Sequence, residues 1–217
     1  MADVHKHFDP NGPGDTAGGI FGLPFSPEQA EVVIVPVPWE VTVSYRAGTA
    51  RGPEHILESS PQLDLFDEDH GAIWTRGIAM LDLPQDVIEE NDRMRPVAQL
   101  AIEFQEAGGL GHDEPFLKAQ LDLLNESCQK MVDYVRRITG GWLDQDKRVI
   151  LLGGDHSTPL GFMQALAERH DEFGILQIDA HMDLRDSYEG FRYSHASAMH
   201  NALQLESVQR LVQVGIR

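Results

Sequence analysis

The chain has 217 residues, and its 35 acidic against 17 basic side chains give a formal net charge of −18 at pH 7. This length fits one α/β domain with a sizeable core and is also compatible with part of a larger protein. The charge argues against nucleic acid or an anionic membrane as the main partner, because both require a cationic protein face. It suits a cationic substrate, although keeping the protein soluble is the simpler reason for it.

Residues 1–30 are expected to form a polar N-terminal arm, and residues 31–217 an α/β domain. Residues 1–19 are polar and rich in Gly and Pro, so they resemble neither a signal peptide nor a membrane span. The chain has no apolar stretch of membrane length, and we expect a cytoplasmic protein. The single cysteine, Cys128, excludes a disulfide framework and a thiolate metal site.

Short apolar runs predict five buried parallel strands, at residues 32–37, 77–81, 149–152, 174–178 and 211–214. The strands alternate with helical patterns. This alternation predicts a mostly parallel sheet with helices on both faces.

Three helical segments are predicted between these strands. Apolar positions recur every three or four residues over 116–138, which indicates a long amphipathic helix that Gly140 and Gly141 end. The acidic stretch 82–115 is expected to be a surface excursion with one helix near residues 97–106. A further helix should follow Ser157, whose side chain could cap it.

Two polar motifs directly follow the third and fourth predicted strands: Gly153-Gly154-Asp155-His156-Ser157 and Asp179-Ala180-His181-Met182-Asp183. If the chain stays extended through the second motif, Asp179, His181 and Asp183 project to one side and converge. A carboxylate can bridge two cations, whereas a neutral imidazole binds one. Ligands of parallel sheets bind beyond the carboxyl ends of the strands, where both motifs lie. Together the motifs therefore predict a site for two divalent metal ions.

Each motif also has an ordinary structural interpretation. The first could be a turn in which the glycines supply backbone freedom and Ser157 caps the next helix. The second is harder to explain in this way, because three ionisable groups on one side of a strand end need a cation between them.

The two motifs, in this order, resemble those of the ureohydrolase family, which includes arginases, agmatinases and related guanidine hydrolases. Further segments are similar to the agmatinase branch: residues 44–49, 52–53 and 214–217. The long acidic stretch and the segments 188–191 and 193–197 favour a divergent agmatinase-like or guanidine-hydrolase subgroup. The resemblance extends from residue 31 to the last residue and implies an arginase-like three-layer α/β/α fold.

The resemblance also implies a ligand set. His156 would bind the first metal ion and His181 the second. Asp179 would bridge both ions, and Asp183 would complete the shell of the first. The metals would be two divalent ions, manganese in most of the family and nickel in some members, although imidazole and carboxylate ligands also suit iron or zinc.

Two further residues receive roles from the resemblance. Asp155 would orient the ligands, although a turn-forming role explains it nearly as well. His195 matches a family histidine near the substrate and would give a proton to the leaving amine; as a lone histidine in a loop it would attract little attention. A metal-activated water would attack the guanidinium carbon of agmatine, guanidinobutyrate, guanidine or a similar compound, releasing urea and an amine or ammonia. The family also implies a homo-oligomer, either a trimer or a hexamer.

The chain departs from the family at its C-terminal end. The third family motif, Ser-x-Asp-x-Asp-x-x-Asp-Pro, and a later glutamate are missing, and the sequence stops near the fifth of eight family strands. In the family, two of the missing strands lie between the third and fourth, so their loss would expose two strand edges. We therefore expect an incomplete domain that is inactive alone. The alternatives are an inactive metal-binding or regulatory subunit, and a deacetylase on a related fold.

Overall fold

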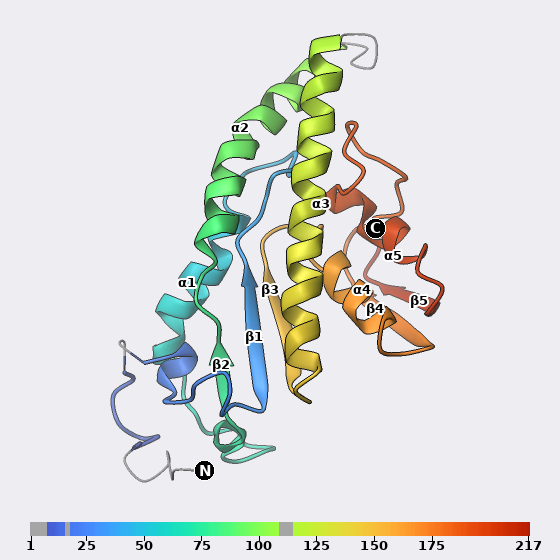
Figure 1. Ribbon diagram of the computed structural model, residues 1–217. Coiled ribbons are helices and arrows are strands. Elements are labelled where there is room, and N and C mark those ends of the chain that lie inside the picture. Colours follow the sequence, from blue (N-terminus) through green and yellow to red (C-terminus); the bar gives the residue numbers. More distant parts are fainter. Residues whose placement is uncertain (1–7, 16–17, 109–114) are drawn as a thin grey trace.

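A computed structural model describes residues 8–15, 18–108 and 115–217. Its strands and helices alternate along the chain (Figure 1), in the order β1 (Val32–Val37), α1 (Gly52–Ser59), β2 (Ile78–Met80), α2 (Gln85–Glu106), α3 (Pro115–Leu143), β3 (Arg148–Gly153), α4 (Leu160–Ala167), β4 (Phe173–Ile178), α5 (Ala198–Ala202) and β5 (Val208–Val214). All five predicted strands are present, within a few residues of their expected bounds.

The strands form two parallel sheets, not one. In the first sheet β1 lies between β2 and β3, with Val32 opposite both Ile78 and Arg148. In the second sheet β4 pairs with β5, and Leu176 lies opposite Val212. No pairing joins β3 to β4 among the described residues, which confirms the expected break at this position.

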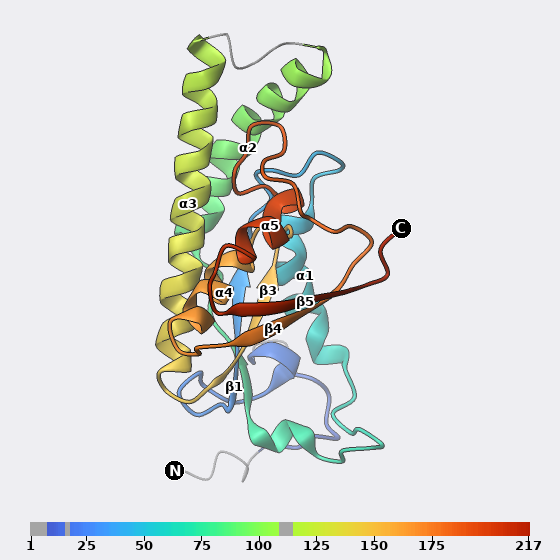
Figure 2. The ribbon, with the colours of Figure 1, turned by 90° about the vertical axis from the view of Figure 1, so that its right-hand side faces the viewer.

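Helices cover both faces of the first sheet. Figure 2 shows α2 and α3 on one side of β1 and β3, and α1 on the other side, so the expected three-layer α/β/α arrangement is confirmed. The central strand is buried on both faces, as is usual for parallel strands between helical layers. The main core joins this strand to the apolar stripe of α3, and includes Val33, Val35, Val37, Leu124, Cys128, Val132 and Val135.

The prediction for residues 82–115 is wrong in most of its length. Helix α2 has 22 residues and packs against α3. Its buried positions recur every three or four residues and include Val87, Met94, Ala98 and Ile102. Charged residues lie between these positions and make the apolar stripe narrow. The segment therefore looks acidic on average, and its average composition does not indicate a helix. Residues 109–114 lie outside the described part of the chain.

Two predicted helix ends are also wrong. Helix α3 continues through Gly140 and Gly141 to Leu143, and the carbonyl of Gly140 accepts a hydrogen bond from Nη2 of Arg169 at 3.0 Å. Gly140 has no side chain, so the guanidinium of Arg169 can approach the helix closely at this position. Ser157 does not cap α4, because its side chain binds Asp155 instead.

The prediction that the strands are buried is wrong beside the break between β3 and β4. The exposed fraction is 48% for Ile150, 65% for Leu176 and 79% for Ile178. Nothing in the described residues covers these faces. Within the expected N-terminal arm, in contrast, Ile20 and Leu23 are buried.

Among the residues that the structure describes, no helix combines the length and the apolar character needed to cross a membrane.

Candidate active site

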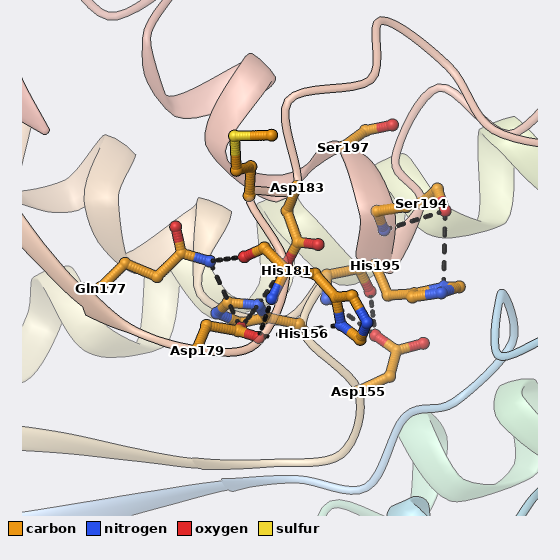
Figure 3. Close-up of polar contacts among 12 residues, drawn as sticks. Asp155, His156, Gln177, Asp179, His181, Asp183, Ser194, His195 and Ser197 are labelled. Carbon is orange, nitrogen blue, oxygen red and sulfur yellow. Dashed lines mark hydrogen bonds and ion pairs between the residues drawn. The ribbon is translucent and has the colours of Figure 1, made fainter. Parts of the chain in front are cut away.

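The two polar motifs meet where β3 and β4 end. Nδ1 of His156 lies 2.6 Å from Oδ2 of Asp183 and 3.0 Å from Oδ2 of Asp179. One ligand atom from each of the three side chains lies within 4.8 Å of the other two. Figure 3 shows these side chains gathered from two motifs that are more than 20 residues apart in the sequence. One imidazole and two carboxylates form a donor set that fits a divalent cation.

Asp183 reaches this cluster through a turn. Strand β4 ends at Ile178, and Asp183 has a φ of 53° in the left-handed region, which Asp tolerates better than most residues. Its carbonyl accepts hydrogen bonds from the amides of Met199 and His200, both at 3.0 Å. The assumption of an extended chain through the second motif is therefore wrong. Asp179 and Asp183 converge because α5 fixes the turn.

His181 lies at the border of the cluster. Its side chain is 75% exposed, and its Nδ1 is 3.9 Å from Oδ1 of Asp179. Its backbone amide donates to the same Oδ1 at 2.9 Å. The structure thus brings His156, Asp179 and Asp183 together, and it leaves the imidazole of His181 outside this group.

Gln177 is a supporting residue that the motif analysis missed. It is buried near the end of β4, and its Nε2 donates to the carbonyl of His181 at 3.0 Å and to Oδ2 of Asp179 at 3.3 Å (Figure 3). These bonds hold the second motif against the strand. The sequence does contain a signal for this role, because Gln177 is a polar residue in an otherwise apolar strand.

The charges within the cluster compensate one another. The hydrogen bond to Asp183 raises the pKa of His156, burial opposes this, and the charges of Asp179 and Asp155 add to the rise. Burial favours a higher pKa for Asp179, but the amide of His181, the side chain of Gln177 and the charge of His156 lower it overall. These shifts favour the protonated imidazole of His156, whose positive charge then lies between the two carboxylates. A bound cation would replace that proton and use the neutral imidazole as a ligand.

Asp155 is buried beside the cluster and is held by other groups. Its Oδ1 accepts hydrogen bonds from the amide of Ser157 at 2.8 Å and from the Ser157 hydroxyl at 2.5 Å. Its Oδ2 accepts from Oγ1 of Thr42 at 3.3 Å. Burial raises the pKa of Asp155, and the hydrogen bonds from Ser157 oppose this rise. The carboxylate therefore anchors the loop between β3 and α4.

His195 lies close to Asp155 by way of Thr42. The backbone amide of His195 donates to Oγ1 of Thr42 at 3.0 Å, and its Nδ1 lies 3.4 Å from the same oxygen. The ring of Tyr188 packs edge-on against the imidazole, with 5.9 Å between the ring centroids. Sequence reasoning missed Thr42, which lies two residues before the agmatinase-like segment 44–49.

The segment 44–49 is held by a buried acid, Glu40. Its Oε2 accepts hydrogen bonds from the amide of Gly48 at 2.5 Å and from the amide of Ala50 at 3.2 Å. Its own backbone amide donates to Oδ1 of Asn91 on α2 at 2.8 Å. The loop after β1 is thus fixed both to α2 and to the segment that follows it.

Comparison with protein families gives one match that covers most of the chain: residues 30–217 match the model of the arginase family. N(1)-aminopropylagmatine ureohydrolase of Thermus thermophilus is 34% identical over 200 residues, which are 91% of this chain and 55% of that protein. Agmatinase of Bacillus cereus is 30% identical over 192 residues, or 88% of this chain and 53% of the relative. The chain spans about half the length of the curated relatives it matches.

Solved structures show the same architecture. Agmatine ureohydrolase of Thermoplasma volcanium aligns with a TM-score of 0.64 and 24% identity, over 100% of this chain and 58% of that one. Arginase from Medicago truncatula aligns with a TM-score of 0.61 and 23% identity, over 87% of this chain and 50% of that one. At these identities the likeness establishes the fold.

Proposed function

This chain belongs to the arginase family, and on that premise we propose that its protein is a metal-dependent hydrolase of a guanidino compound. The products would be urea and an amine or ammonia. The observation that carries the proposal is the convergence of His156, Asp179 and Asp183 at the strand ends. Relatives named agmatinase and N(1)-aminopropylagmatine ureohydrolase support a substrate such as agmatine, with guanidinobutyrate and guanidine as further candidates.

In this proposal His156, Asp179 and Asp183 hold the first of two divalent ions. Asp179 also reaches toward His181, which would serve the second ion. Manganese is the proposed metal and nickel the second choice, because both accept imidazole and carboxylate ligands. The bound ions would lower the pKa of a water molecule and so supply the nucleophile at neutral pH.

The remaining groups of the chain orient these ligands and handle protons. Gln177 and the amide of His181 fix the carboxylate of Asp179, so that one oxygen stays directed at His156. His195 would give a proton to the leaving amine, since imidazole is the side chain that titrates nearest to neutral pH. The net charge of −18 would favour the approach of a guanidinium cation.

One observation favours a second candidate, an inactive metal-binding or regulatory subunit. Within the described residues only three side chains form the ligand cluster, and His181 lies outside it. Two carboxylates neutralise half of the charge of two divalent ions, so the second ion would be weakly held.

Urea release is the test that separates these proposals. The protein that carries this chain would be assayed with agmatine, aminopropylagmatine, guanidinobutyrate, arginine and guanidine, first with manganese and then with nickel. The matched control is Asp179→Asn, which keeps the size of the side chain and removes its charge. Urea from one substrate, lost in the control, supports the hydrolase. Bound metal without urea supports the inactive subunit, and release of acetate from acetylated amines would indicate a deacetylase.

A further inference from the structure

We propose that Thr42 is a positioning residue that links Asp155 to His195 and fixes which imidazole nitrogen carries the proton. The proposal deepens the proposed function and rests on it, because it assigns the working nitrogen of the residue proposed to move a proton. Three contacts converge on Oγ1 of Thr42: the amide of His195 at 3.0 Å, Oδ2 of Asp155 at 3.3 Å and Nδ1 of His195 at 3.4 Å.

The hydrogen-bonding capacity of a hydroxyl decides the direction of these contacts. A hydroxyl donates one hydrogen bond and accepts up to two. The amide of His195 can only donate, so it occupies one acceptor position of Thr42. A carboxylate can only accept, and Ser157 occupies Oδ1 of Asp155, so the Thr42 proton goes to Oδ2. The remaining acceptor position faces Nδ1 of His195, which must then carry a proton.

Burial removes the alternative partners for this arrangement. The exposed fraction is 0% for Thr42 and 7% for Asp155. Buried polar groups are nearly always paired, and water has no access to compete for the hydroxyl. The backbone amide of Asp155 also donates to the carbonyl of Trp39 at 2.8 Å, three residues before Thr42. The donor and the acceptor of the link are thus held by neighbouring loops after β1 and β3.

Ser194 is the competing partner of the imidazole. Its Oγ lies 3.5 Å from Nδ1 of His195 and accepts a hydrogen bond from the amide of Ala196 at 3.2 Å. If Ser194 donated its proton to Nδ1, the opposite tautomer would result and Nε2 would carry the hydrogen. The geometry points to Thr42, because its own proton already has an acceptor in Oδ2 of Asp155 and its hydroxyl is left to accept from Nδ1. Nε2 is then the nitrogen free to exchange protons with a substrate, by the same logic that orients a catalytic histidine through its second nitrogen.

The ring tautomer of His195 is the direct test, and it does not depend on turnover. Long-range 1H–15N spectra of the full-length protein would be recorded at a pH where the ring is neutral, with His195→Asn used to assign its signals. We expect the Nδ1–H tautomer in the wild type, in Ser194→Ala and in Thr42→Ser. Thr42→Val keeps the shape of the side chain but removes the hydroxyl, and it should shift the ring toward the Nε2–H form.

Kinetics provide the second readout. With the active substrate, Thr42→Val should lower kcat about 10-fold, as removal of an orienting partner does, with KM and metal content unchanged. Thr42→Ser keeps the hydroxyl and should have the kcat of the wild type. Any of three results would overturn the proposal: the Nε2–H tautomer in the wild type, an unchanged tautomer in Thr42→Val, or a kcat of Thr42→Ser as low as that of Thr42→Val. If no substrate gives urea, the proposed function fails while the ring spectra still decide the role of Thr42. If Thr42→Val does not fold, the spectra of the wild type, Thr42→Ser and Ser194→Ala decide it.

Discussion

Replacing Gly154 with Ala tests how the chain places its ligands. A Cβ atom at Gly154 would lie 2.2 Å from the carbonyl oxygen of Trp39 and 2.7 Å from that of Val37. Both are backbone atoms, so no side-chain rotation relieves the clash. Gly154 is not among the glycines with positive φ. Glycine is therefore required at this position for close approach between two loops, and not for backbone freedom.

The size of the effect follows from these distances. Ordinary van der Waals contact begins at 3.4 Å, so the loops after β1 and β3 must move apart by more than 1 Å. Overpacking of this kind costs ~1–3 kcal/mol. The hydrogen bond from the amide of Asp155 to Trp39 lies at the same contact, and its loss adds ~1 kcal/mol. We expect Gly154→Ala to lower the free energy of unfolding by about 2–4 kcal/mol in total.

The same movement should reach the proposed metal site. His156 is two residues beyond Gly154, and its imidazole is placed by the loop that the new Cβ displaces. We expect divalent metal affinity to fall at least ~10-fold, the usual result of disturbing the support of a ligand.

Gly141→Ala is the matched control. A Cβ there meets nothing within 4 Å, and the residue lies inside α3, where Ala is more stable than Gly by ~0.5–1 kcal/mol. Chemical denaturation and a metal competition titration of both variants would check the contrast. If Gly154→Ala unfolds at the wild-type denaturant concentration and binds metal normally, the close-approach argument is wrong.

Three further predictions concern single side chains. Asp179→Asn should abolish turnover and reduce bound metal, whereas His181→Ala should lose one of two ions; wild-type stoichiometry by elemental analysis in both variants would contradict the proposed ligand set. His195→Asn should lower kcat ~10²-fold with metal still bound, and an unchanged kcat would remove this residue from the mechanism. The hydrogen bond from Arg93 lowers the pKa of Glu90 in the folded state. Ionised Glu90 therefore stabilises the fold above the unfolded carboxyl pKa of ~4.3, and this contribution is lost as the pH falls through the folded pKa. Glu90→Gln should then cost less than ~1 kcal/mol at neutral pH and nothing in strong acid, and a pH-independent difference in denaturation would refute the assignment.

The strands were predictable because their signal is local. A run such as Val32–Val37 is β-branched and apolar at successive positions, and strand β1 has these bounds in the structure. The separation into two sheets has no local signal, since β3 and β4 look alike in sequence. It was expected only from the resemblance to a family with strands at that place.

The parts of the site that escaped prediction depend on tertiary contacts. The left-handed turn at Asp183 is set by the amides of α5, which are more than 15 residues away. The meeting of Thr42 with Asp155 and His195 joins three loops that are distant in the chain. Spacing within one motif cannot report such contacts, although it did identify Asp179 as a ligand candidate.

The open strand edges and the small ligand cluster lie at one place in the molecule. The motif with His156 follows β3, and the motif with Asp179 follows β4, the two strands on either side of the break. Polypeptide that pairs with these edges must end or turn beside the same carboxylates, because parallel strands present their carboxyl ends on one side of a sheet. It would also cover exposed apolar side chains such as Ile178. We therefore expect the stability of the sheet and its affinity for divalent metal to rise together when such polypeptide is present.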